Sequence, residues 1–362
     1  MELERGTADP EVGGSTPPKP PRKKITIMTQ ESEIYIGISE KELAASKAEF
    51  ELELEGELTA PYTEMYLGQL YAAIGEVNSP AEFIRKGEEL HHKIAHDVYG
   101  PLILGCAQFM GQYLSSAGIE GNVYYALRDA KPLMTAAVHV MPSFGLNPVG
   151  IYINRPLCGI GDEINPEVVP NGDMTAMTKK YLGQNGALGQ EKVGWVDAGC
   201  WGTVPLVLKM HHFQAKDYYP VFFYSHNPEV PDYLHQLSGG TGVSEEALNC
   251  MNDSLECLFP SPVRRPLLLV EQCGQVVPKL KPSSVLSQKW GEAALGGIAQ
   301  YAQEKSGQGI TFTEQQDALE TFLAKIEQSK QGIWSGTLWQ STPIWSQGED
   351  FLAKYPKGLF GV

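Results

Sequence analysis

Residues 193–209, VGWVDAGCWGTVPLVLK, decide the fold. Val193–Asp197 is a short apolar run of the kind that forms a buried β-strand, and it ends in a carboxylate. The turn Ala198–Thr203 contains two glycines, and Thr203 then begins an apolar helix that tolerates Pro205 in its first turn. A strand, a glycine-containing turn and a helix in this order predict one βα unit of a parallel sheet.

Strand and helix patterns alternate on both sides of this unit. Three more apolar runs of strand length stand at Asn122–Leu127, Val149–Ile153 and Tyr219–Tyr224, and helix-period segments separate them. This alternation is typical of an α/β protein with a parallel, doubly wound sheet that has helices on both faces. Residues 119–240 are therefore predicted to form an α/β ligand-binding core.

The flanking regions have other patterns. Residues 1–24 include GGSTPPKPPRKK, which cannot bury apolar surface, so a flexible tail is expected. Residues 25–118 begin with two β-like runs, KITIMTQ and EIYIGI, and continue as helices. An S-x-x-E capping box at Ser39–Glu42 predicts one helix start, and Pro101 predicts the start of a helix that is apolar enough to pack on the sheet. Residues 241–362 are predicted to be mainly helical, with one short β-run, RRPLLLVEQ (264–272).

Composition and charge exclude several classes of protein. Hydrophobic residues make up 42% and charged residues 20% of the 362-residue chain, as in globular proteins. With 28 basic and 43 acidic residues, the net charge is −15, which argues against broad binding to nucleic acids or anionic membranes. The sequence contains no run of about 20 apolar residues, so no membrane span is predicted. The acidic N-terminus lacks the apolar segment of a secretory signal.

The cysteines indicate the compartment. None of the six forms a C-x-x-C pair, so we expect reduced thiols in a cytoplasmic protein. The cysteines are Cys106, Cys158, Cys200, Cys250, Cys257 and Cys273.

The turn after Asp197 is the strongest candidate for a ligand site, because ligands of α/β sheets bind at the carboxyl ends of the strands. Gly199 and Gly202 let backbone N–H groups face a phosphate at a helix N-terminus, and Thr203 can add a hydroxyl donor. Asp197 can accept from ribose hydroxyls or hold Mg²⁺ through water. Cys200 lies in the same turn, where the helix N-terminus would lower its pKa, so a covalent role is one alternative. An ordinary βα turn capped by Thr203 is the other.

Polar residues follow the other predicted strands as well. Arg128 and Asp129 come directly after Asn122–Leu127, and Lys131 begins the next helix. The planar guanidinium suits phosphate or carboxylate, and the adjacent carboxylate can orient it or help hold a cation. A local ion pair at a strand end is the structural alternative. Four further candidate ligand-binding residues follow the remaining two strands: Asn154, Arg155, Ser225 and His226.

Two of these segments together resemble a known family. ALRDAKPLM (126–134) and WVDAGCWGTVP (195–205) are similar to the two-loop arrangement of type I phosphoribosyltransferases, in which one loop holds pyrophosphate and the other the 5′-phosphate of phosphoribosyl pyrophosphate (PRPP). The resemblance implies that Arg128 and Asp129 lie on the pyrophosphate side, that Asp197 faces ribose, and that the glycine turn and Thr203 hold the 5′-phosphate. The family usually carries two adjacent acids before this turn, and Ala198 stands at the second position here.

A second resemblance covers residues 100–281. Its segments, among them GPLILGCAQFM, YYALRDAKPLM and GWVDAGCWGT, are similar to the region that follows the hydrolase portion of certain haloacid-dehalogenase-like bacterial proteins, where LxRDG and VDxGxxG recur. The chain has no D-x-D-x-T motif, so an aspartyl-phosphate mechanism is not expected.

Three functional hypotheses follow. The first is a phosphoribosyltransferase-like enzyme that binds a phosphorylated sugar or nucleotide with Mg²⁺. The second is a phosphohydrolase-like enzyme that uses the same loops, and the third is a non-catalytic ligand sensor or partner-binding protein. For the third, three C-terminal tryptophans offer a surface for self-association, unless they close the core over the sheet. They are Trp334, Trp339 and Trp345.

A histidine pair is a separate candidate. His92 and His96 have the i, i+4 spacing of a transition-metal pair on one helix face. No third ligand is apparent in the sequence, so a structural or surface cluster is the favoured interpretation.

Overall fold

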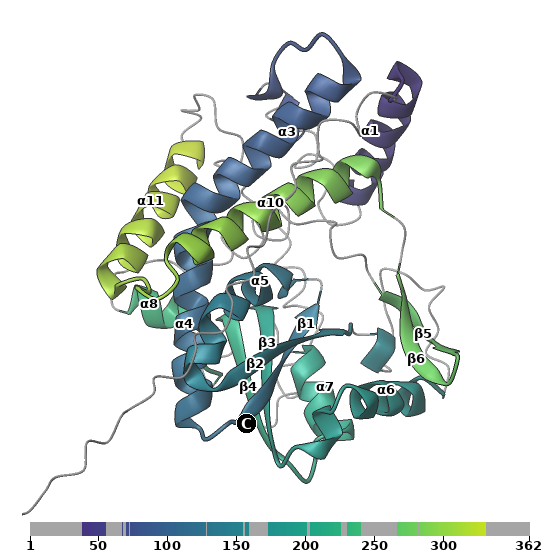
Figure 1. Ribbon diagram of the computed structural model, residues 1–362, viewed down its shortest axis with the longest axis vertical. Coiled ribbons are helices and arrows are strands. Elements are labelled where there is room, and N and C mark those ends of the chain that lie inside the picture. The colour runs from purple at the N-terminus through teal and green to yellow at the C-terminus, as the bar shows by residue number, and fades with distance from the viewer. Residues whose placement is uncertain are drawn as a thin grey trace, which may run out of the picture. The chain divides into compact units, whose positions relative to one another are not determined.

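The core of the protein is a four-stranded, all-parallel sheet with the strand order β2-β1-β3-β4 (Figure 1). The strands are β1 (Gly121–Leu127), β2 (Leu146–Tyr152), β3 (Lys192–Cys200) and β4 (Asp217–Ser225). All four lie where the sequence predicts strands, and the α/β class with a parallel sheet is confirmed. The computed structural model describes residues 38–55, 67, 70–71, 73–127, 129–154, 156–158, 173–200, 203–225, 230–239, 266–280 and 283–330.

Helices lie on both faces of this sheet, as the alternation of side chains along β3 shows. Gly194 packs against α4 (Gly100–Ser116), because a Cβ atom added to it would lie 3.3 Å from Leu114. Trp195 points to the other face, where it is fully buried among side chains that include Leu182 and Leu208. These two leucines come from α6 (Asp173–Gln184) and α7 (Thr203–His211). α5 (Lys131–Val140) connects β1 to β2.

The helix before the sheet does not break where the sequence predicts a new start. α3 (Pro80–Ile94) continues through one π-helical turn, η1 (Ala95–Tyr99), directly into α4. Pro101 has no N–H to donate back along the helix, and a π turn is one of the local rearrangements that accommodate such a residue. The separate helix expected at Pro101 is therefore the continuation of a longer one.

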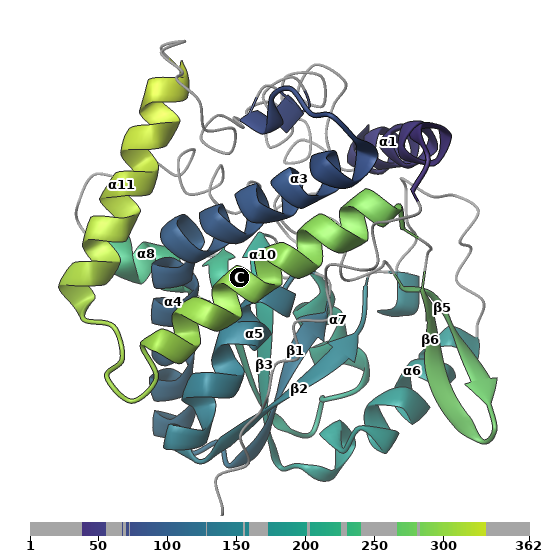
Figure 2. The ribbon, with the colours of Figure 1, turned by 45° about the horizontal axis from the view of Figure 1, so that its top comes forward.

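α10 (Val285–Glu304) packs along α3 and η1 (Figure 2). Trp290 of α10 is buried in this contact and donates its indole N–H to the Ile84 carbonyl at 3.1 Å. α10 therefore joins residues that the sequence assigns to the N-terminal and C-terminal regions. The remaining helices are α1 (Glu40–Glu55), α8 (Tyr233–Ser238) and α11 (Phe312–Lys330), and the short 3-10 turns are η2 (Met141–Phe144), η3 (Pro156–Cys158) and η4 (Ala187–Gly189).

α1 begins with the predicted capping box. The Ser39 N–H donates to the Glu42 carboxylate at 2.8 Å, and the Glu42 N–H donates to the Ser39 hydroxyl at 3.3 Å. Toward the other end of α1, Glu53 accepts hydrogen bonds from the backbone N–H and the hydroxyl of Ser284, which caps α10.

An antiparallel hairpin, β5 (Pro266–Gln272) and β6 (Gln275–Leu280), packs beside α6. The sequence predicts its first strand but not its second. Cys273 and Gly274 form its two-residue turn, and both have positive φ angles, 52° and 79°, as a type I′ turn requires.

Some expectations concern residues outside the described ranges. They include the tail 1–24, the two β-like runs before Ile38, the helix expected after Gly240 and the C-terminal tryptophans. Within the described ranges, no helix combines the length and apolar character needed to cross a bilayer. Cys106, Cys158 and Cys273, the cysteines whose state is described, are free thiols.

Candidate functional site

The sheet changes direction between β1 and β3. The chain passes from β1 outward to β2, then returns across β1 to place β3 and β4 on the other side. In open parallel sheets, the crevice at the carboxyl ends of the two strands that flank such a point is where ligands bind. Here those ends are Leu127 of β1 and Cys200 of β3. The candidate site is built at this edge.

The β1 side of the edge brings two charged residues to the start of α5. Asp129 lies half-buried in the turn after β1, and Lys131, also half-buried, is the first residue of α5 as predicted. The N-cap residue of α5, Ala130, makes no side-chain hydrogen bond to the first turn. The positive end of the helix dipole and one ammonium group therefore meet here. Arg128 lies outside the described residues.

The β3 side differs from the prediction. β3 does not end at Asp197 but runs to Cys200, so Ala198–Cys200 are strand residues rather than a turn. Gly199 and Cys200 pair with Tyr224 and Ser225 of β4. The strand is longer than expected because this pairing with β4 continues past the carboxylate.

Gly199 has a packing role in this pairing. Its φ angle is +134°, and a Cβ atom placed on it would lie 1.8 Å from the carbonyl oxygen of Tyr224. The close approach of β3 to β4 thus accounts for this glycine without a ligand. Thr203 begins α7 as predicted, whereas Gly202 lies outside the described residues.

Asp197 shares one face of the sheet with Trp195, by alternation along β3. Two groups that the sequence analysis missed, Cys158 of η3 and Tyr218 of β4, lie near its carboxylate. Burial raises the pKa of the Cys158 thiol, and the charge of Asp197 raises it further. Burial and the same charge, together with Cys158, raise the pKa of the Tyr218 phenol well above its usual value.

These shifts limit what the two groups can do. A neutral thiol and a neutral phenol beside a carboxylate can donate hydrogen bonds to it, but neither can serve as an anionic nucleophile at neutral pH. The position of Tyr218 on the Asp197 face follows from the register of β3 on β4, Asp197 opposite Phe222. The sequence contains the two residues but not that register, so it could not signal the cluster.

Two of the four candidate residues at the ends of β2 and β4, Asn154 and Ser225, lie within the described ranges. The side-chain oxygen of Asn154 accepts a hydrogen bond from the Leu157 N–H at 3.0 Å and so caps η3, which gives this residue a structural role. Ser225 is the last residue of β4, opposite Cys200, and only 1% of its surface is exposed. Arg155 and His226 lie outside the described residues.

The histidine pair lies away from this edge, on α3 and η1. The rings of His92 and His96 stack with their centroids 6.4 Å apart. The two ring nitrogens of His96 contact Asp97 at 2.7 Å and Glu304 of α10 at 3.1 Å. Burial opposes protonation of His96, but these two carboxylates outweigh it and raise its pKa. The ring therefore joins η1 to α10.

In the part of the chain that the structure describes, no group of three or more His, Cys, Asp or Glu residues could hold a metal ion by itself. A cation at the sheet edge would need ligand oxygens in addition to Asp129 and Asp197. Comparison of the sequence with models of known families and with curated proteins yields no match.

Proposed function

We propose that this protein is a phosphoribosyltransferase-like enzyme that binds a phosphorylated sugar or nucleotide of the PRPP type, with Mg²⁺, between the carboxyl ends of β1 and β3. The strand order β2-β1-β3-β4 carries the proposal. It matches the start of a doubly wound sheet, in which ligands bind where the order reverses. The two segments that resemble phosphoribosyltransferase loops, 126–134 and 195–205, include the carboxyl ends of these two strands, one on each side of the reversal.

The residues at this edge offer groups that suit such a ligand. Lys131 brings a positive charge to the start of α5 in a protein whose net charge is −15, and it can contact a phosphate there. Asp129 and Asp197 supply carboxylate oxygens, and Mg²⁺ is commonly held by one or two carboxylates together with substrate phosphates. The bound ion would offset the charge of a pyrophosphate leaving group. The protein would then act mainly by positioning the ligand and stabilising charge.

Calorimetric titration with PRPP and with ribose 5-phosphate, each with and without Mg²⁺, tests this proposal. We expect Mg²⁺-dependent binding to the wild type, loss of that binding in Asp197→Asn, and binding weakened by roughly tenfold or more in Lys131→Ala, since a hydrogen bond to a charged group is removed. Asp217→Asn is the matched control, because Asp217 is exposed at the opposite end of the sheet, where β4 begins. No binding of either ligand to the wild type, or equal affinity in all the variants, would refute the assignment.

One observation favours a non-catalytic form of the same site. Ala198 is fully buried in β3 and, by alternation, points to the face opposite Asp197. The position at which phosphoribosyltransferases usually carry a second acid is thus a methyl group in the core. PRPP binding without release of pyrophosphate across a panel of acceptors would support a ligand sensor. Release of inorganic phosphate from a panel of phosphate esters would instead support the phosphohydrolase-like alternative.

A further inference from the structure

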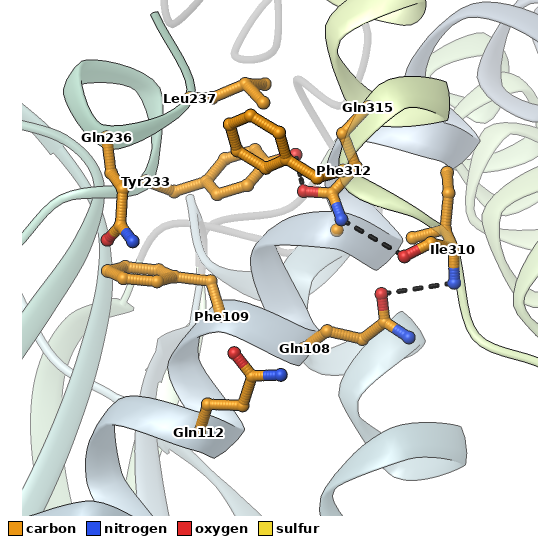
Figure 3. Close-up of a pocket in the computed structure, with 10 residues that line it drawn as sticks. Gln108, Phe109, Gln112, Tyr233, Gln236, Leu237, Ile310, Phe312 and Gln315 are labelled. Atoms are coloured by element: carbon orange, nitrogen blue, oxygen red, sulfur yellow. Dashed lines mark hydrogen bonds between the residues drawn. The ribbon is translucent and has the colours of Figure 1, made fainter. Parts of the chain in front are cut away.

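A pocket lies on the α4 side of the sheet, between α4, α8 and the start of α11 (Figure 3). Its volume is about 230 Å³. None of the ten described residues that line it is charged, and four of them are glutamines. In a protein with 71 charged side chains, 28 basic plus 43 acidic, this lining is unusual. It disfavours phosphates and carboxylates as ligands, because a buried charge needs a partner.

The floor of the pocket is fixed by hydrogen bonds. Gln315 accepts from the Tyr233 hydroxyl at 2.9 Å and donates to the Ile310 carbonyl at 3.2 Å. Gln108 accepts from the Ile310 N–H at 3.2 Å. Gly105 keeps the floor open, since a Cβ atom there would lie 2.6 Å from the Gln315 side-chain oxygen. A glycine inside a helix lowers helix stability by about 1 kcal/mol relative to alanine. The pocket space beside Gly105 therefore comes with a small loss in the stability of α4.

The mouth of the pocket carries two side-chain amides that have no hydrogen-bond partner among the described residues. Gln112 and Gln236 are exposed, and neither side-chain amide makes a hydrogen bond to another described residue. Each amide offers one acceptor oxygen and two donor hydrogens. In the view of Figure 3, the Phe109 ring lies between these two amides. Two adaptable amides therefore flank an aromatic surface.

A second aromatic ring stands at the opening. Phe312, the first residue of α11, is 54% exposed although it lines the pocket. A ligand that covered this ring would bury apolar surface that now contacts water. Phe109, Tyr233 and Phe312 thus give the pocket three aromatic rings, and such a lining favours a flat ligand that can stack.

We propose that this pocket binds an uncharged, planar heterocycle whose edge carries both a hydrogen-bond donor and an acceptor, such as a nucleobase or an aromatic carboxamide. Side-chain amides pair with edges of that kind, as glutamine does with adenine. A volume of about 230 Å³ is below the usual range for drug-sized ligands and suits one ring system rather than a whole nucleotide. The pocket adjoins β4, where Tyr233 packs 6.0 Å from Phe223, so it is distinct from the β1–β3 crevice and does not depend on the function proposed there.

Ligand-observed NMR and calorimetry on the full chain can test this with adenine, nicotinamide and nicotinate. Nicotinamide and nicotinate have the same ring and nearly the same size, but only nicotinate is charged. We expect adenine or nicotinamide to bind and nicotinate to bind at least about tenfold more weakly. Gln112→Ala and Gln236→Ala change exposed side chains, so the fold should persist while affinity falls roughly three- to tenfold in each.

Gln303→Ala, an exposed glutamine on α10 away from the pocket, is the matched control and should bind like the wild type. Three results would overturn the proposal. They are no binding of adenine or nicotinamide at millimolar concentration, equal affinity for nicotinate and nicotinamide, or affinity unchanged in both pocket variants.

Discussion

At the scale of single residues, Gly199 shows how a motif can have a structural cause. A glycine in a turn before a helix suggests a phosphate-binding loop. Here Gly199 lies in β3 instead, and the position that a Cβ atom would take faces the backbone of β4. The sequence could not separate these interpretations, because the distance between β3 and β4 depends on their pairing. Features that depend only on neighbours along the chain, such as the Ser39–Glu42 capping box and the start of α7 at Thr203, were predicted correctly.

Gly199→Ala should therefore destabilise the fold whether or not a ligand binds. The added methyl group would collide with the Tyr224 carbonyl at a positive φ angle, and we expect a loss of about 2–4 kcal/mol in the free energy of unfolding. Urea denaturation measures this loss. In Gly183→Ala, at an exposed site in α6 where a Cβ atom would make only an ordinary contact of 3.7 Å with Leu188, stability should instead rise by up to about 1 kcal/mol. Equal effects of the two substitutions would contradict the packing explanation.

At the scale of elements, the sequence predicted correctly those strands and helices whose apolar residues form a clear pattern. All four strands of the sheet were placed within a few residues, because buried parallel strands are almost continuously apolar. β6 was missed, since QVVPKL contains a proline and its turn has Cys273 rather than the usual asparagine or aspartate. Contacts with other parts of the fold, rather than favourable turn residues, hold the hairpin in place. A local sequence pattern cannot predict such contacts.

One of these contacts comes from the side chain of Gln184 on α6, beside the buried Leu269 and Val276 of the hairpin. This side chain accepts a hydrogen bond from the Val276 N–H at 2.9 Å and donates one to the Val276 carbonyl, as the backbone of a neighbouring strand would. In Gln184→Ala both backbone groups lose their partner, so we expect local stability of the hairpin to fall by about 1–3 kcal/mol. Hydrogen exchange over residues 266–280 should become faster by a factor of roughly 5 or more.

Lys180→Ala is the comparison for this experiment. It removes the exposed ion pair with Glu271, at 2.7 Å, in the same interface. Exposed pairs contribute about 0–1 kcal/mol, so exchange should change little. If Lys180→Ala accelerated exchange as much as Gln184→Ala, the backbone pairing would not be what holds the hairpin.

At the scale of the whole molecule, stability should depend on pH through His91. This residue is buried where α3 meets α10, with its ring stacked on Trp290 at 5.1 Å. Burial lowers its pKa from 6.5 to about 3. Between these values the unfolded chain binds a proton that the folded protein does not, so stability present above pH 6.5 is lost as the pH falls.

His91→Phe keeps a ring against Trp290 and removes this titration. The slope of unfolding free energy against pH between 6.5 and about 3 should become smaller by roughly 1.4 kcal/mol per pH unit. Chemical denaturation at several pH values measures the slope. Parallel curves for wild type and His91→Phe would show that His91 is not the cause.

The π turn between α3 and α4 also determines in which direction the side chains of α4 point around the helix axis. Each residue of a helix advances the side chains by about 100°, so the extra residue in this turn offsets the buried stripe of α4 from that of α3 by that angle. Deleting one residue between Ala95 and Tyr99 would restore a single period and turn Gly105 and Gln108 away from the partners they now meet. Because of this one extra residue, a single continuous helix packs against α10 at its α3 end. At its α4 end the same helix presents Gly105 and Gln108 to the glutamine-lined pocket.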